Sequence, residues 1–449
     1  MALEVRGRVI VGQQHGSPAA GGGPLISRND RDHRDDGDGH PIGEKREEAS
    51  SSWCDLEDID DDLDDERDPS SSSPWWDASE GGRVSGGPED RDDSDAAEAL
   101  WGCSGSGRTL RNGKYAVISL VGHGTFGEVL KCEETPEAGD GDARGGVFRL
   151  VAVKRVFLQK TVRSKETCYA NTLEHAAREA ETLRSVRCAN VLRIYDQWED
   201  EHVLSMALEY CVADLRHLLD KHPEVVRAPA MGKRIMRDLL AGLSAIHAKG
   251  IIHRDIKPSN CLVSSEGIVK LGDFGQATFA ETYRREGSLT HAVSTRWYRA
   301  PELLYGSRTY SSSVDVWSLG CTIAELVLPH PLVCGESDID QMAKVFRCFG
   351  TPTEESWPGV GALPDHGKII FDVFEARPLA SVFPGASAAM LDFFSGFFHL
   401  DPAKRSTAED LLAHPFFEED PPPCPAEDLG RALLHLKLED LRVKSNANN

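Results

Sequence analysis

Two short polar clusters, each beside an apolar stretch, constrain the fold of this chain more than any other feature. The first is His-Arg-Asp at 253–255, with Asn260 five residues after the aspartate, inside the largely apolar segment 251–263. The second is Asp-Phe-Gly at 273–275, one residue beyond the strand predicted over Val269–Leu271. A merely solvated surface does not place such side chains together in this order. We therefore interpret the clusters as parts of one polar site of the kind that phosphate transfer needs.

A glycine-rich stretch upstream is a third part of this site. It lies between two β-rich segments and contains Gly122, Gly124 and Gly127. Without Cβ atoms, such a backbone can approach a triphosphate closely and direct N–H groups at it. A glycine-rich hairpin explains the stretch comparably well until Lys154, on the next predicted strand, is added. Lys154 would contact the α- and β-phosphates and needs a carboxylate to hold it. Glu179 is the candidate, and Glu181, which points to another face of its helix, is a weaker one.

The remaining polar residues suit the chemistry of phosphoryl transfer, which requires positioning and positive charge around the moving group. Asp255 can accept the proton of a substrate hydroxyl and orient its attack, and Lys257 can neutralise charge on the transferred phosphate. Asn260 and Asp273 carry the oxygen ligands that Mg²⁺ prefers. The sequence therefore predicts ATP and Mg²⁺ as cofactors.

The composition changes sharply near residue 112. Up to there lie 27 of the 73 acidic residues but only 12 of the 50 basic ones, in a stretch rich in Gly, Ser and Pro without apolar periodicity. Such a segment cannot bury enough apolar surface to offset the entropy of ordering, so residues 1–112 are predicted to be a disordered acidic extension. The rest is mildly acidic, which argues against nucleic acid as a partner.

The chain also lacks signs of a membrane or secreted protein. No apolar run approaches the roughly 20 residues that span a bilayer, and the first residues do not resemble a signal peptide. The 11 cysteines form no Cys-x-x-Cys pair, which is typical of reduced thiols inside the cell. We therefore expect the protein in the nucleus, the cytoplasm or both, without membrane partners.

Hydrophobic patterns predict two lobes and a tail. Residues 113–211 should form a small lobe with strands over 117–121, 128–132, 150–156, 191–195 and 203–208 and a helix over 174–186. Residues 212–417 should form a larger, helical lobe, with helices over 313–327, 339–349, 388–398 and 407–414. Residues 418–449 form a tail whose leucines predict a short amphipathic helix, more simply explained as docked on the large lobe than as a partner site.

With these motifs, the chain resembles the eukaryotic protein kinases, and later segments narrow the resemblance to the cyclin-dependent kinases. These segments are Ser294–Gly306, Val314–Cys321, Ser337–Gln341, Gly350–Pro352 and Trp357–Gly359. The resemblance covers about residues 115–417 and is closest to the cell-cycle-related and cyclin-dependent-kinase-activating branches. It implies an α+β, bilobal protein-kinase fold with the nucleotide between the lobes. It also implies a serine/threonine kinase, directed at Ser/Thr-Pro sites, in cell-cycle or transcription-related signalling.

The resemblance also assigns roles to individual residues. The backbone of Glu209 and Cys211 should bind adenine behind the gatekeeper Leu208, and other nucleotide contacts fall on Val121, Val129, Ala152, Asp214 and Leu262. Arg299 and Ser294 lie where the family forms its pocket for the proline after the target residue. Glu302 should pair with Arg405, and Asp315 should brace the catalytic loop.

Regulation is where the chain departs from the family. Thr290 falls at the activating phosphorylation site, and two of the three arginines that would hold its phosphate are present, Arg254 and Arg178. The third position is Thr278. In the glycine-rich stretch Thr125 keeps a hydroxyl, but Phe126 replaces the inhibitory tyrosine. Because the segment before Glu179 also lacks the cyclin-recognition sequence, dependence on a cyclin or cyclin-like activator stays open.

Two rival functions are weighed against this one. A pseudokinase scaffold would bind partners without transferring phosphate. Such proteins typically lack at least one of the residues equivalent to Lys154, Asp255, Asn260 and Asp273, and this chain has all four. A kinase of the mitogen-activated type would carry Thr-x-Tyr in its activation segment, whereas here Thr282 and Tyr283 are adjacent.

Overall fold

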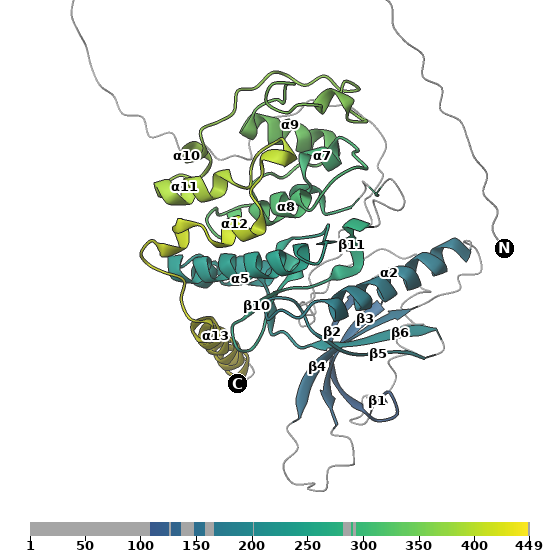
Figure 1. Cartoon of the computed structure of the whole chain (residues 1–449). Helices are drawn as coiled ribbons and strands as arrows, with labels where there is room; N and C mark the ends of the chain where they lie inside the picture. Colours follow the sequence, from purple (N-terminus) through teal and green to yellow (C-terminus); the bar gives the residue numbers. More distant parts are fainter. Residues whose placement is uncertain are drawn as a thin grey trace, which may run out of the picture. The chain divides into compact units, whose positions relative to one another are not determined.

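The computed structural model describes residues 108–124, 127–135, 148–157, 166–200, 202–281, 289–290 and 293–447 (Figure 1). Most of the predicted acidic extension, Thr125 and the Thr282-Tyr283 pair lie outside these residues. No helix among the described residues is long and apolar enough to cross a membrane.

The small lobe is an antiparallel sheet of six strands with one long helix, α2, beside it. The strands follow the order β1-β2-β3-β4-β6-β5. Their bounds are β1 (Thr109–Leu110), β2 (Tyr115–Gly124), β3 (Gly127–Glu134), β4 (Arg149–Phe157), β5 (Ile194–Asp200) and β6 (Val203–Glu209), with α2 at Glu166–Ser185. One face of the sheet buries a small apolar cluster of Tyr115, Leu130, Cys132, Val151, Val153 and Ala207. The predicted β-rich small lobe with one helix is confirmed.

Two strands differ from the sequence prediction. β1 pairs with the start of β2 but has only two residues, too few for any hydrophobic alternation to reveal. β5 begins at Ile194 rather than at 191, because the preceding apolar residues bond to the other lobe. Leu192 N–H donates to the carbonyl of Leu271 (2.9 Å), and Leu271 N–H donates to the carbonyl of Asn190 (2.9 Å). An apolar run that looked like a strand end is therefore a connection between the lobes.

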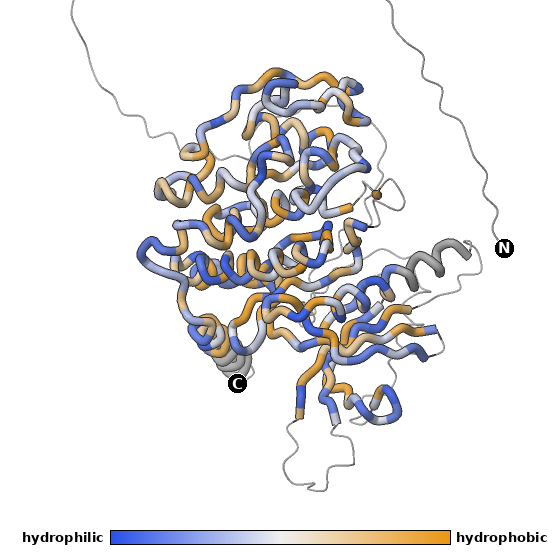
Figure 2. Tube along the Cα trace, in the orientation of Figure 1, coloured by the Kyte–Doolittle hydropathy of each residue, from blue (hydrophilic) through white to orange (hydrophobic). Residues whose placement is uncertain are grey.

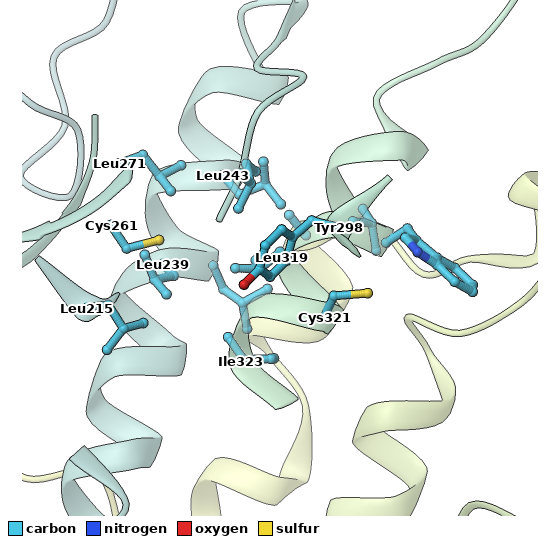
Figure 3. Close-up of a cluster of buried hydrophobic side chains, with 14 of the residues drawn as sticks. Leu215, Leu239, Leu243, Cys261, Leu271, Tyr298, Leu319, Cys321 and Ile323 are labelled. Atoms are coloured by element: carbon cyan, nitrogen blue, oxygen red, sulfur yellow. The ribbon is translucent and has the colours of Figure 1, made fainter. Parts of the chain in front are cut away.

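The large lobe is mostly helical, as predicted. Its helices are α3 (Leu215–Lys221), α4 (Pro223–Val226), α5 (Pro229–His247), α7 (Pro301–Leu304), α8 (Ser313–Ala324), α9 (Asp338–Phe349), α10 (Leu379–Val382), α11 (Ala388–Ser395), α12 (Ala408–Leu412) and α13 (Ala426–Ala447). In Figure 2, α5 alternates between hydrophobic and hydrophilic segments, as expected for a helix with one buried face. By contrast, α8 is buried almost all round, and its Leu319, Cys321 and Ile323 lie in the apolar cluster of Figure 3 with residues of α5.

A short hairpin brings the two polar clusters together. β9 (Cys261–Val263) pairs antiparallel with β10 (Val269–Leu271), and Cys261 lies opposite Leu271. Asn260 directly precedes β9, and Asp273 follows β10 after one intervening residue, Gly272, so both lie at the open end of the hairpin. A backbone bond from Gly272 N–H to the carbonyl of Asn260 (2.9 Å) continues the pairing to this point.

The tail forms the helix α13, which at 22 residues is longer than the short helix predicted but is docked on the large lobe as expected. Leu429 is fully buried and Leu433 nearly so, in the main apolar core. The helix lies against the turn between β9 and β10, where a Cβ atom on Gly267 would come within 2.0 Å of the carbonyl of Ala426. Because Gly267 also has a φ of +80°, only glycine suits this position.

Candidate active site

A pocket lies where the two lobes meet, and most of the residues predicted to contact the nucleotide line it. The lining residues with a predicted role in nucleotide binding, catalysis or metal binding are Val121, Val129, Ala152, Lys154, Glu179, Leu208, Glu209, Cys211, Asn260, Leu262 and Asp273. The pocket also includes Leu192, Tyr210, Ser259 and Gly272, of which the sequence analysis had assigned none a contact. Apolar side chains from β2, β3, β4 and β9 face one another across it, which suits a flat aromatic base.

Lys154 is held at the polar end of this pocket by two carboxylates. Its Nζ lies 2.9 and 2.8 Å from the two side-chain oxygens of Glu179 and 3.1 Å from Oδ1 of Asp273. Burial disfavours the ammonium, but the two carboxylates outweigh it and raise the pKa of Lys154. Burial likewise opposes ionisation of Asp273, yet Lys154 lowers the pKa of this carboxyl below its ordinary value. The expected pair with Glu179 therefore forms, and Asp273 stays ionised beside it.

A second network surrounds Asp255. Its Oδ2 accepts a hydrogen bond from the side-chain amide of Asn260 (3.0 Å) and lies 3.1 Å from Nζ of Lys257. Its Oδ1 accepts bonds from the backbone N–H and the hydroxyl of Thr295, both at 3.2 Å. The ammonium of Lys257 donates to the same hydroxyl (2.9 Å). The arrangement points one carboxylate and one cation in fixed directions, as proton acceptance and charge neutralisation require.

Buried contacts keep this loop in place. Both carboxylate oxygens of Asp315, on α8, accept backbone N–H groups, from His253 and Arg254 (2.8 Å each). Burial would raise the pKa of Asp315, but the hydrogen bond from His247 and its charge lower it instead. The His253 ring packs on Phe274, with centroids 4.6 Å apart, and so joins the two clusters. Asp315 thus braces the catalytic loop as expected.

Three non-glycine residues near the site adopt left-handed backbone conformations. Arg254, Asp273 and Ser294 have φ values of 68°, 53° and 69°. Such conformations cost about 1–3 kcal/mol each and persist only where the surroundings over-determine them. The Asp315 bonds supply that constraint at Arg254, and Lys154 supplies it at Asp273.

The glycine-rich stretch forms the end of the β2–β3 hairpin. Gly122 pairs with Val129, and Gly124 pairs with Gly127. A Cβ atom on Gly127 would come within 1.9 Å of the carbonyl of Arg155, so close packing against β4 already demands a glycine there. None of the three glycines lines the pocket as described, and their contact with phosphates stays a prediction.

Asp214 requires a correction, because it does not line the pocket. Its side chain is fully buried, and Oδ1 caps α3 by accepting the N–H of His217 (2.9 Å). Burial raises the pKa of Asp214 to about 6. The sequence resemblance assigns this carboxylate to the nucleotide, but its side chain is turned inward and caps the first turn of α3.

The segment expected to meet the substrate is tied to Arg299. The guanidinium donates to the carbonyls of Val293 and Ser294 (3.0 Å each) and to Oδ2 of Asp338 (2.9 Å). Farther inside, Arg405 forms the expected two-pronged bridge to Glu302, with both contacts at 2.7 Å. The contacts of Arg299 fix the backbone of the segment expected to meet the substrate, whereas the Arg405–Glu302 bridge has a structural role.

The predicted regulatory residues are brought together only in part. Arg254 and Thr290 share one neighbour, the hydroxyl of Tyr310, whereas Thr278 is buried in β11 (Thr278–Phe279). Arg178 lies beside Glu179 on α2. The same helix contacts the Asp-Phe-Gly turn, where Nδ1 of His175 lies 3.1 Å from the carbonyl oxygen of Gly275. Thr125 lies outside the described residues.

Besides those four pocket-lining residues, two side chains near the catalytic loop, Thr295 and Tyr310, have contacts that the sequence does not predict. Thr295 was part of a recognised segment but carried no assigned role, since a threonine in a loop has no signature of its own. Tyr310 likewise looked like an ordinary tyrosine before a helix. Each becomes visible only when the chain folds back on the catalytic loop.

Comparisons with known proteins agree with this geometry. A model of the protein kinase domain matches residues 115–417. Cyclin-dependent kinase D-1 of Oryza sativa subsp. indica is 36% identical over 319 residues, which cover 71% of this chain and 70% of that protein. Cyclin-dependent kinase 7 of Xenopus laevis is 34% identical over 335 residues, 75% of this chain and 89% of that one.

A solved structure is similar as well. The structure of the CAK complex from Chaetomium thermophilum bound to ATP-γ-S contains a chain with a TM-score of 0.62 and 32% sequence identity. The match covers 70% of this chain and 94% of that one. Nothing in these comparisons favours the pseudokinase alternative. The chain belongs to the protein kinase family, in which it is an ATP-dependent serine/threonine kinase of the cyclin-dependent type.

Proposed function

We propose that this kinase phosphorylates serine or threonine residues that are followed by proline. The supporting observation is the backbone at Val293 and Ser294, whose carbonyl oxygens already accept hydrogen bonds from within the protein. Ser294 is left-handed, and Arg299 already takes the carbonyls of both residues. A backbone N–H in the residue after the target would find no acceptor here, whereas proline has no N–H to satisfy.

Asp338 supports this arrangement from α9. One of its oxygens holds Arg299 (2.9 Å) and the other holds Arg296 (3.0 Å). Because the guanidinium is fixed from both sides, it cannot swing away to free a carbonyl for an incoming peptide. The preference is therefore built into the enzyme rather than formed by the substrate.

A set of three peptides tests the proposal. They share one sequence and differ only after the target serine, which is followed by proline, N-methylalanine or alanine. Since an unsatisfied N–H costs about 1–3 kcal/mol, kcat/KM for the alanine peptide should fall roughly five- to hundredfold below the other two. Ser294→Gly is the matched control, because glycine takes the same φ freely and should keep the preference. Equal rates for alanine and proline would refute the proposal, and so would an N-methylalanine peptide as poor as alanine.

We also propose that Asn260 and Asp273 hold Mg²⁺ together with the phosphates of ATP. Asn260 uses its amide nitrogen on Asp255, which leaves its carbonyl oxygen for another ligand, and Nζ of Lys154 lies 3.1 Å from Oδ1 of Asp273. Among the described residues no cluster of three or more acidic, His or Cys side chains could hold a metal alone. Two protein oxygens fit Mg²⁺, which typically completes its shell with phosphates and water.

We further propose a cyclin-type activator and a role in cell-cycle or transcription-related signalling. The support is the similarity to kinases named for cyclin dependence and to a chain of a multi-protein complex. The test is to purify a catalytically impaired Asp273→Asn form from the nuclear and cytoplasmic fractions of cells, since the nucleus and the cytoplasm are its expected locations. The proteins that are purified with it identify the activator and the signalling context. Recovery of a cyclin-fold protein in stoichiometric amount supports the proposal. Wild-type enzyme that is recovered alone and is fully active without an added partner contradicts it.

A further inference from the structure

Thr290 is anchored through its backbone rather than its side chain. The hydroxyl of Tyr310 donates to the carbonyl of Thr290 (2.5 Å), and one residue earlier the N–H of Leu289 donates to the carbonyl of Arg308 (2.8 Å). Leu289 is buried, whereas the side chain of Thr290 is exposed. Two independent bonds therefore fasten this part of the activation segment to residues 308–310, and neither uses the threonine hydroxyl.

The same tyrosine also contacts the catalytic loop. Its hydroxyl oxygen accepts a hydrogen bond from Nη1 of Arg254 (3.1 Å), while Nε of Arg254 donates to the carbonyl of Gln276 (2.6 Å). Burial raises the pKa of Tyr310, so the phenol keeps the proton that it donates to Thr290. One hydroxyl thus joins the arginine next to Asp255 with the backbone at the phosphorylation site.

Thr278 stands at the position of the third arginine of the expected phosphate pocket, and its side chain carries no positive charge. Its side chain is buried in β11, where its backbone pairs with Ile252. A third positive charge is therefore missing at this position of the phosphate pocket. A neutral hydrogen-bonded tether from Tyr310 is present in the same region.

We propose that Tyr310 is a positioning residue that holds residues 289–290 of the activation segment in place without phosphate on Thr290. Because its acceptor is a main-chain carbonyl, the bond survives whatever happens to the threonine side chain. Phosphate on Thr290 would add charge-assisted bonds to Arg254 on top of this tether. The enzyme should accordingly keep part of its activity before phosphorylation. The inference rests on the kinase activity itself and not on the preference for proline.

The test combines Tyr310→Phe with Thr290→Ala. The phenylalanine keeps the ring and its packing but removes the hydroxyl, and the alanine removes the phosphorylation site but keeps the carbonyl. In the Thr290→Ala background, Tyr310→Phe should lower kcat about five- to thirtyfold, with little change in KM for ATP, because it deletes bonds to a carbonyl and a cation. Amide hydrogen exchange at 289–290 should accelerate in parallel.

A second comparison separates positioning from general stability. In enzyme fully phosphorylated on Thr290, the same Tyr310→Phe change should cost clearly less, since the phosphate supplies its own bonds. Tyr305→Phe, which removes a hydroxyl from the buried aromatic cluster beside Trp357, is the matched control and should alter neither activity nor exchange. Unchanged activity and exchange in the Tyr310→Phe, Thr290→Ala enzyme would overturn the proposal. An equal loss with and without phosphate would overturn it as well.

Discussion

At the scale of single residues, the active site depends on side chains that hold other side chains. Thr295 contacts both Asp255 and Lys257 and so sets the distance between the proton acceptor and the cation. No hydrophobic period or charge pattern marks such a residue. The catalytic residues themselves are recognisable because several polar side chains stand at fixed spacing within apolar segments. The residues that support them have no such spacing and are brought near only by the fold.

Replacement of Thr295 tests its role. Thr295→Val keeps the shape but removes the hydroxyl, so Asp255 and Lys257 lose a shared partner. Bonds to charged groups contribute about 1.5–3 kcal/mol, so kcat should fall roughly ten- to a hundredfold while KM for ATP hardly changes. Thr295→Ser, which restores the hydroxyl, should recover most of the rate. A valine variant as fast as the serine variant would show that the hydroxyl is idle.

Asp214 makes a separate prediction about pH. Its pKa is raised to about 6 in the folded protein and is near 4 when exposed, so the folded state binds its proton more tightly. The free energy of unfolding should therefore decrease as the pH rises from about 4 to 6. Asp214→Asn keeps a helix cap but cannot ionise. Denaturant unfolding of both proteins across this range should show a smaller decrease for the asparagine variant, and identical slopes would contradict the burial argument.

At the scale of elements, hydrophobic periodicity and residues that start or stop a helix or strand predict most of the helices and strands. Tertiary contacts determine where these elements end. Helix α9 begins within one residue of its predicted start, because Ser337 caps it. Helix α11 ends at Ser395, before the predicted 398. A Cβ atom on the next residue, Gly396, would lie 2.8 Å from the hydroxyl of Ser406, a contact far away in sequence. Propensity can reveal a helix, but it cannot reveal a neighbour.

The tail helix α13 offers a test of its docking. Leu429 is fully buried against the large lobe, whereas Leu434 on the same helix is 59% exposed. Leu429→Ala should lower the free energy of unfolding by about 2–5 kcal/mol, because it leaves a cavity. The matched change Leu434→Ala should stay within about 0.5 kcal/mol. Equal effects in denaturant titrations would mean that the helix does not dock as described.

At the scale of the whole molecule, the boundary between the acidic extension and the kinase domain lies earlier than composition indicates. Composition changes near 112, but β1 pairs at 109–110, Val117 N–H donates to the carbonyl of Arg108 (2.9 Å), and Arg111 forms an ion pair with Asp196. These contacts involve too few residues to alter an average over a long window. The start of a fold is therefore hard to predict from composition alone.

Two truncations separate these boundaries. Removal of residues 1–107 should leave Tm and peptide-kinase activity nearly unchanged, because a low-complexity acidic stretch makes few buried contacts. Removal of residues 1–112 should lower Tm by a few degrees, since it also deletes a strand and an ion pair. Identical melting of the two proteins would show that β1 adds nothing, and a large loss in the shorter truncation would show that the extension packs on the domain.

The central claim is that Lys154, Asp255, Asn260 and Asp273 form one phosphoryl-transfer site. Its most direct test is single-turnover transfer from ATP to a peptide by the wild type, Lys154→Met and Asp273→Asn, each verified as folded by its Tm. Both variants should lose several orders of magnitude in rate, since each removes charge stabilisation made in the transition state. Transfer at the wild-type rate by either folded variant would contradict the account.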